Sequence, residues 1–128
     1  MGSIPAGPLS DALGDLDDSE TLTRIEDLVP GLRPGDFRLL IDGDSMDEAG
    51  LLDGMTAFFR PNVRPAARQI CAVYVEGEGG TVKRVEPHHH RVRLIPDSSN
   101  PVHVPVDLPA DQVLVQGVLV ASFSVRLF

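Results

Sequence analysis

The sequence places one serine in a setting that suits a nucleophile. Ser45 lies in the stretch Ile41-Asp-Gly-Asp-Ser-Met46, in which a predicted strand runs into a tight turn. Gly43 allows the backbone that tight path, so the Ser45 hydroxyl can be presented with backbone N–H groups pointing outward beside it. Taken alone, Gly-Asp-Ser is a common surface turn, and a serine hydroxyl is a weak nucleophile that needs a base.

A lysine on a later predicted strand could supply that base. With period-2 alternation Thr81, Lys83 and Val85 share one face, which we expect to be buried. A lysine in apolar surroundings loses hydration, its pKa falls, and it can act as a general base. The alternative is an edge-strand lysine that discourages aggregation. Together, Ser45 and Lys83 predict a Ser/Lys dyad, a known variant of the catalytic triad.

The other reactive side chains suggest less. Cys71 lies in an apolar run and is expected to be a buried strand residue. Three adjacent histidines at positions 88–90 point in different directions and predict a solvated turn, with no metal site. His103 lies in a separate segment, and the acids and histidines suggest no Ser-His-Asp set. We expect no cofactor.

Length and composition limit the elements that can position these residues. The 128 residues suit one domain, and 42% hydrophobic with 23% charged residues is ordinary for a globular chain. A formal net charge of −8 disfavours direct DNA binding by this chain. No apolar run is long enough to span a membrane and no signal peptide is recognisable, so we expect a cytoplasmic location.

Short β-like runs separated by turn residues predict a mostly β, compact antiparallel fold. A helical turn is expected within residues 23–29, and a turn or one helical turn at residues 45–51. We divide the chain into an arm and connecting segment (1–36) and a β domain (37–128). The predicted strands are residues 37–41, 55–59, 69–76, 80–85, 91–96, 102–106 and 113–128, the last long enough to bend.

The first residues have a different character from the domain. The stretch Ile4-Pro5-Ala6-Gly7-Pro8 cannot be helical and should be extended and exposed. An acidic run at residues 11–20 follows, which favours a flexible, solvated arm. Met1-Gly2-Ser3 is typical of a cloning remnant, so we expect the chain to be a piece of a longer protein.

Ordered motifs across the chain resemble the catalytic domain of LexA-type repressors and UmuD-like proteins. The agreement runs from about residue 37 to residue 125, in the family's order. The motifs are Gly43-Asp44-Ser45-Met46, Gly50 with Asp53-Gly54, Thr81-Val82-Lys83-Arg84, residues 92–96, Asn100-Pro101, Pro105-Val106 and Gly117-Val118.

The resemblance implies self-cleavage at an Ala-Gly bond upstream of the serine, which here is Ala6-Gly7. It implies that Lys83 takes the Ser45 proton and that Ser45 attacks the Ala6 carbonyl. Backbone N–H groups of Asp44 and Ser45 would stabilise the oxyanion. The chain departs from the family's pattern in Pro5 before Ala6, in Asp53-Gly54-Met55, and in an extra glycine before Lys83.

The resemblance favours the C-terminal domain of a LexA-like SOS repressor, with a helix-turn-helix upstream of residue 1. It implies a homodimer formed through the strand near residues 117–128, and activation of cleavage by a RecA filament on single-stranded DNA. A UmuD-like accessory subunit of a translesion DNA polymerase is the alternative, and a non-catalytic dimerisation module of a repressor is weaker. A signal peptidase is disfavoured, because Pro87 and the histidines follow the lysine motif where that family has a Gly-Asp segment.

Overall fold

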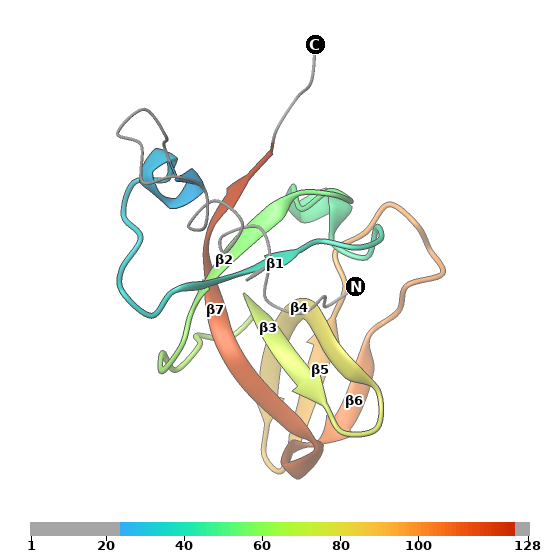
Figure 1. Cartoon of the computed structure of the whole chain (residues 1–128). Helices are drawn as coiled ribbons and strands as arrows, with labels where there is room; N and C mark the ends of the chain where they lie inside the picture. The colour runs from blue at the N-terminus through green and yellow to red at the C-terminus, as the bar shows by residue number, and fades with distance from the viewer. Residues whose placement is uncertain (1–23, 125–128) are drawn as a thin grey trace.

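A computed structural model describes residues 24–124 of the chain, and their fold is a single antiparallel sheet of seven strands. The order across the sheet is β1-β2-β7-β3-β4-β5-β6, so the last strand in the chain is an interior strand, third across the sheet (Figure 1). This confirms the predicted mostly β, antiparallel fold. The strands are β1 (Phe37–Leu40), β2 (Thr56–Arg60), β3 (Gln69–Val75), β4 (Gly79–His88), β5 (Arg91–Ile95), β6 (Val106–Pro109) and β7 (Val113–Phe123).

Helical structure within the described range is limited to three short 3-10 turns. They are η1 (Ile25–Leu28), η2 (Asp47–Ala49) and η3 (Ala110–Gln112), and the first two fall where the sequence predicts helical turns. None of the helices in this part of the chain is long and apolar enough to cross a membrane. The predictions for the first residues, namely the flexible arm and the Ala6-Gly7 bond, concern residues outside the described range.

The long strand β7 joins the two halves of the sheet. Its C-terminal part pairs with β2 and its N-terminal part with β3, as its sweep in Figure 1 shows. The register shifts once against each partner, which leaves Val120 and Gln116 as extra residues on β7. Such bulges increase strand bending and twist. The predicted bend of this strand is therefore present, and it gives the whole sheet a curled shape.

The curled sheet encloses apolar clusters on both of its faces. On β3, Ala72 packs in one cluster with Leu39 and Phe59, whereas Cys71, Val73 and Val75 pack in the other. On β4, Val82 and Val85 are likewise divided between the two clusters. Strand β3 is therefore covered on both sides along most of its length, which accounts for its nearly continuous apolar sequence, whereas on β4 only Val82 and Val85 are fully buried.

Two predicted strand boundaries were wrong. Residues 102–105, predicted to be strand, form a turn and irregular loop, and β6 begins only at Val106. Pro101 and Pro105 have no N–H to donate to a strand ladder. Between them, the N–H groups of Val102 and His103 donate to Asn100. Strand β4 extends to His88, beyond the predicted end at residue 85, because it pairs with β5 as far as His88 and Arg91.

Two ion pairs connect the segment before β1 with the sheet. Asp36 accepts two hydrogen bonds from Arg60 of β2, at 3.0 Å from Nε and 2.9 Å from Nη2. This bidentate pair lowers the pKa of Asp36, since the guanidinium stabilises its charged form. Arg38 of β1 is buried and lies 3.0 Å from a carboxylate oxygen of Glu26 in η1. The connecting segment from residue 24 is thus held against the sheet.

Gly117, in the middle of β7, provides a test of this packing. A Cβ at that position would lie 2.9 Å from the Phe37 ring and 3.0 Å from Phe59 Cβ, closer than real Cβ contacts. We predict that Gly117→Ala lowers the free energy of unfolding by about 1–3 kcal/mol, as overpacking does elsewhere. Urea denaturation measures the loss, with Ser122→Ala at an exposed position of β7 as the control. An unchanged midpoint for Gly117→Ala would contradict this packing.

Candidate functional site

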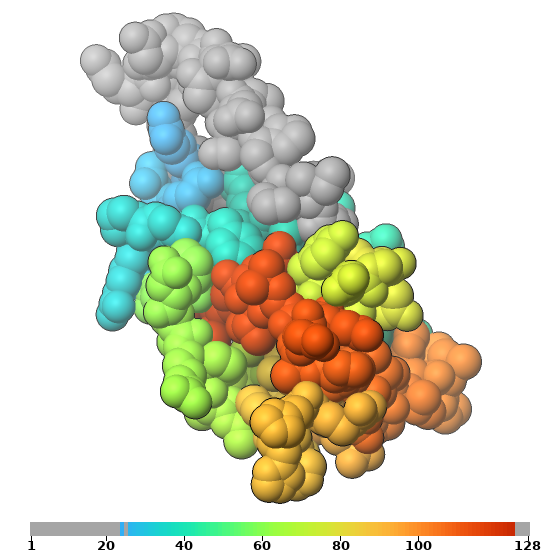
Figure 2. Space-filling model, turned by 90° about the horizontal axis from the view of Figure 1, so that it is seen from below, coloured from blue at the N-terminus to red at the C-terminus, as the bar shows by residue number. Residues whose placement is uncertain are grey.

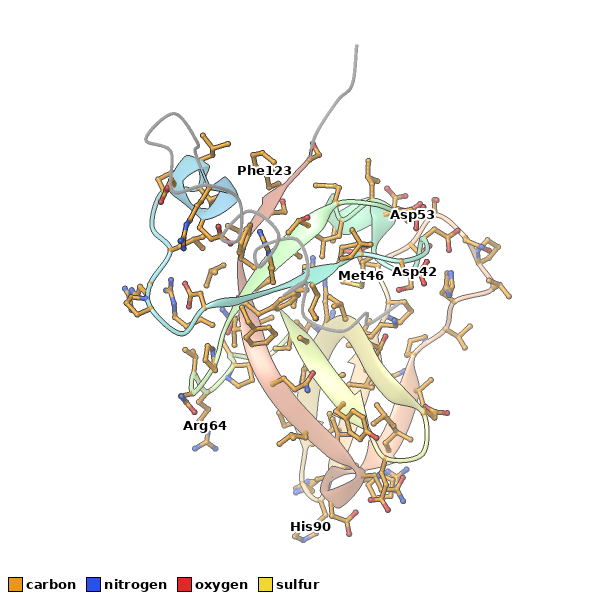
Figure 3. The ribbon with its side chains drawn as sticks, viewed as in Figure 1. Asp42, Met46, Asp53, Arg64, His90 and Phe123 are labelled. Atoms are coloured by element: carbon orange, nitrogen blue, oxygen red, sulfur yellow. The ribbon has the colours of Figure 1, made fainter. Side chains whose placement is uncertain are left out.

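Ser45 lies in a compact turn that follows β1. Ile41 extends the pairing of β1, because its N–H donates to the Met55 carbonyl at 2.8 Å. Gly43 then adopts a φ of 95° and donates its N–H to the Asp53 carboxylate at 2.8 Å. This left-handed φ favours glycine, as the sequence predicted for this turn. Figure 3 shows Asp42 and Asp53 together at this end of the molecule.

The next residues anchor the turn in the core. Met46 and Leu51 are each only 2% exposed, and the Leu51 N–H donates to the Met46 carbonyl at 3.2 Å. The 3-10 turn η2 lies between them and ends at Gly50, with φ 86°. Ser45 itself is 7% exposed. Its hydroxyl is therefore held at a defined place beside the sheet.

Lys83 of β4 points directly at this hydroxyl. Its Nζ lies 2.9 Å from Ser45 Oγ and 2.8 Å from Thr81 Oγ1, and it also donates to the Val82 carbonyl at 3.2 Å. Thr81 and Lys83 share a strand face, as period-2 alternation predicts. The structure thus brings together the two residues that the sequence pairs across 38 positions.

Burial changes the acid–base behaviour of this amine. Desolvation lowers the pKa of Lys83 from its ordinary value of 10.5, because the charged ammonium loses hydration. Lys83 is also the single lysine of the chain, beside ten arginines. A neutral amine within hydrogen-bond distance of a hydroxyl can accept its proton. The pair therefore has both the geometry and the shifted pKa that a base and a nucleophile require.

A cleft of about 230 Å³ opens beside Lys83. Its walls come from three places: the β3–β4 hairpin, the strands β5 and β6, and the loop that precedes β6. They are mainly apolar, apart from Glu78, Thr81 and the amine itself. The lining residues are Val75, Glu78, Gly79, Gly80, Thr81, Lys83, Leu94, Val104, Val106 and Leu108. An extended apolar peptide could lie in such a cleft with a carbonyl near Ser45.

The loop between β5 and β6, here called the 97–103 loop, packs on the serine turn. Asp97 donates its N–H to the Ser45 carbonyl at 2.9 Å, and its own carbonyl accepts from the Glu48 N–H at 2.9 Å. The Ser98 hydroxyl donates to the Asp44 carbonyl at 2.7 Å. Ser99 donates both its N–H and its hydroxyl to the Asp47 carboxylate, at 2.8 and 2.5 Å. In Figure 1 this orange loop reaches the turn at η2.

Asp44, the residue before Ser45, receives side chains from the same loop. Its carboxylate lies 2.6 Å from His103 Nε2 and accepts a hydrogen bond from the Asn100 amide at 3.1 Å. These contacts lower the pKa of Asp44, with His103 as the largest cause and Asn100 next. In the same way, hydrogen bonds from Ser99 lower the pKa of Asp47.

The remaining predicted residues lie away from this pair. Cys71 is fully buried, as predicted, and burial raises the pKa of its thiol to about 11, which disfavours a reactive thiolate. His88 is the last residue of β4, and His89 and His90 form the turn that follows it. All three histidines are exposed; this turn is gold in Figure 2, and Figure 3 places His90 at the far end from Met46. Among residues 24–124, no group of three or more His, Cys, Asp or Glu is placed to hold a metal ion.

Several residues around the dyad were not identified from the sequence. The face shared with Lys83 could have indicated Thr81 as a partner. No local sequence pattern indicates the contacts of Ser98, Asn100 and His103, because their partners lie more than fifty positions earlier in the chain. The cleft is lined by valines and leucines, which are common in strands, and the sequence alone cannot distinguish them from residues of the hydrophobic core.

A buried serine in contact with a half-buried lysine, beside an apolar cleft on a curled antiparallel sheet, is the arrangement of a candidate hydrolytic site. The model of the Peptidase S24-like family matches residues 1–120. The chain therefore belongs to the Peptidase S24-like family, which confirms the resemblance found in the sequence.

Curated relatives agree with this family assignment. The chain is 34% identical over 125 residues to a LexA repressor of Deinococcus radiodurans, which covers 97% of this chain and 57% of the relative. It is 35% identical over 123 residues to a LexA repressor of Acidiphilium cryptum, covering 95% and 50%. A LexA repressor of Citrifermentans bemidjiense is 30% identical, with 96% and 59% covered. The chain thus spans about half the length of these relatives.

The burial of Lys83 leads to a measurable titration. We predict that the Lys83 amine titrates below 10.5, because burial disfavours its charged form. Reductive ¹³C-methylation of the Ser45→Ala variant gives one lysine signal, which NMR follows against pH. Lys83→Arg in the same background identifies that signal by its loss. A midpoint at or above 10.5 would show that the amine is solvated or charge-stabilised.

Proposed function

We propose that this chain cleaves its own Ala6-Gly7 bond, with Ser45 as the nucleophile and Lys83 as the general base. The observation that carries the proposal is the 2.9 Å contact between Lys83 Nζ and Ser45 Oγ, with the lysine pKa lowered by burial. Membership of a peptidase-like family and the adjoining apolar cleft support it. The proposal needs no metal ion or cofactor, since the amine supplies the base.

The proposed reaction has two stages, acylation of Ser45 and hydrolysis of the ester. Neutral Lys83 takes the hydroxyl proton as Ser45 Oγ attacks the Ala6 carbonyl carbon, and the backbone N–H groups of Asp44 and Ser45 stabilise the resulting oxyanion. Collapse breaks the C–N bond, and the Lys83 ammonium returns its proton to the departing Gly7 amine. The product is an ester between Ser45 and Ala6. A water then gives its proton to Lys83 and attacks the ester carbonyl. The C–Oγ bond breaks, Lys83 returns the proton to Ser45 Oγ, and the Ala6 carboxylate is released.

Substrate and nucleophile share one chain, which has a kinetic consequence. The local concentration of the bond is high, so the rate depends on how often the bond occupies the cleft in a reactive geometry. The family's activator, expected to be a RecA filament, would act by favouring that occupancy. Small residues on both sides of the bond suit a close approach to Ser45.

The position of Ile4 suits the apolar cleft. In an extended peptide, side chains two positions apart point the same way, so Ile4 and Ala6 would face the same wall. With the Ala6 carbonyl at Ser45, the Ile4 side chain would lie within reach of Leu94 and Leu108, which line the cleft. We infer that an apolar residue two positions before the cleaved bond contributes to binding.

The biological role that we favour is the C-terminal half of a LexA-like SOS repressor in the cytoplasm, inactivated by this cleavage. The LexA repressors to which the chain is similar support this role. The full protein would then carry a helix-turn-helix before this segment and dimerise through β7. The UmuD-like accessory subunit is the second candidate, because such proteins have the same domain without a DNA-binding part. The coding sequence upstream of Met1 separates the two roles.

The chemistry is tested by incubation at alkaline pH. We predict that cleavage after Ala6 becomes faster as pH rises and levels off above the pKa of Lys83, which lies below 10.5, because only the neutral amine accepts the proton. Mass spectrometry should show loss of residues 1–6. Ser45→Ala and Lys83→Ala should abolish the reaction, whereas Ser122→Ala and Arg64→Ala, at exposed positions, should not. Cleavage by either dyad variant at the parent's rate would refute the mechanism.

The role of Ile4 is tested in the same assay. We predict that Ile4→Asp slows cleavage by about tenfold or more, since a carboxylate gains nothing from an apolar wall and must be desolvated to enter it. Ile4→Val should remain close to the parent. Leu9→Asp is the matched control, because it adds the same charge beyond the cleaved bond. Equal rates for Ile4→Asp and the parent would remove Ile4 from the binding model.

A further inference from the structure

We propose that Asp44 and His103 are positioning residues, whose contact holds one wall of the cleft at a fixed place relative to Ser45. The inference rests on the proposed self-cleavage. Asp44 directly precedes Ser45 in the chain, and His103 directly precedes Val104, which lines the cleft. The 2.6 Å contact between Asp44 Oδ1 and His103 Nε2 therefore links the nucleophile to the surface on which the peptide lies.

The Asp44–His103 contact holds the end of the 97–103 loop, whereas other contacts hold its beginning. Residues 97–99 are held to the serine turn by backbone and serine hydrogen bonds. The end of the loop has little apolar packing, since Val102 is 71% and Val104 62% exposed. Among the described residues, His103 provides the hydrogen bond that ties residues 102–105 to the serine turn.

Asn100 reinforces the contact from within the loop. Its amide donates to Asp44 Oδ2, and its side-chain oxygen accepts the Val102 N–H at 3.1 Å. The His103 N–H also donates to the Asn100 carbonyl, at 3.2 Å. Asp44, Asn100 and His103 thus form one connected network, in which the carboxylate accepts from both side chains.

The contact is compatible with the conditions that the dyad requires. The pKa of Asp44 is lowered, so its carboxylate is charged at neutral and alkaline pH. A neutral imidazole with its proton on Nε2 still donates a hydrogen bond. The Asp44–His103 contact can therefore persist at the pH at which Lys83 is neutral.

Loss of His103 should affect two reactions of Ser45 differently. The serine turn keeps its contacts with Asp97, Ser98 and Ser99, so the nucleophile stays in place. The segment with Val104 loses its attachment, so a peptide in the cleft is misaligned. Cleavage of the chain should fall, whereas reaction of Ser45 with a small electrophile that does not use this wall should continue.

The first experiment compares cleavage rates of the full chain at alkaline pH. His103→Ala should cleave about tenfold or more slowly, as small misplacements of a reacting group do. His103→Gln, whose amide can occupy the place of Nε2, should restore the rate to within about threefold of the parent. His90→Ala removes an exposed histidine of the β4–β5 turn and should cleave normally. Normal cleavage by His103→Ala would overturn the proposal.

The second experiment separates wall position from nucleophile position. Diisopropyl fluorophosphate forms an Oγ–P bond with Ser45 and releases fluoride, and mass spectrometry gives the rate. We expect labelling of His103→Ala to stay within about twofold of the parent, since the two reactions use different parts of the site. Equal losses in labelling and cleavage would show that His103 acts on the serine itself, which contradicts the assignment to the cleft wall.

A third measurement is independent of catalysis. In the Ser45→Ala background, His103→Ala should speed amide hydrogen exchange at Val102, because its hydrogen bond belongs to the network. His90→Ala should not. If the parent chain neither cleaves nor labels, the proposed function fails, and the exchange rates alone decide whether the network holds the loop. Unchanged exchange in His103→Ala would overturn the positioning role.

Discussion

The hydrogen bond between Lys83 Nζ and Ser45 Oγ is the interaction on which the rest of the site depends. It is useful only if the amine can be neutral, and neutrality requires that the ammonium be poorly hydrated. Burial of an amine is costly for a fold, and the structure limits this cost with three acceptors, from Ser45, Thr81 and the Val82 backbone. The same desolvation that opposes the charged lysine favours the neutral amine, which can accept a proton.

The curled sheet provides the surroundings that this amine needs. Strand β4 pairs with β3 on one edge and β5 on the other, so Lys83 projects from an interior strand of the sheet rather than from an exposed edge. Strand β7 makes the curl possible, because it pairs with β2 and β3 in turn and is bulged against each. The turn that carries Ser45 is anchored separately, through Met46 and Leu51 in the core. The Ser45 hydroxyl and the Lys83 amine therefore come from two separate elements whose relative position is fixed by packing.

The 97–103 loop adds a second level of organisation. It contacts the serine turn almost entirely through polar groups. Two hydrogen bonds join backbone to backbone, and other groups of the loop bond to the carboxylates of Asp44 and Asp47. Polar contacts of this kind fix orientation more than they add stability, because each replaces a hydrogen bond to water. A loop held in this way can define the shape of a peptide cleft and remain open to solvent. That combination suits the proposed cleavage of a segment of the same chain.

The sequence by itself determined the fold class, most strand positions, the serine turn and the pairing of Ser45 with Lys83. Alternation along a strand and a glycine with positive φ are local properties, and the order of motifs identified the family. Only the tertiary structure decided the end of β4, the loop at residues 102–105, and the contacts of Asp44 with Asn100 and His103. These features depend on groups far apart in the chain, and no local pattern encodes them. The lowered pKa of Lys83 depends on both. Alternation in the sequence predicted the strand face that carries Lys83, but the lysine is desolvated by neighbours that only the curled sheet brings together.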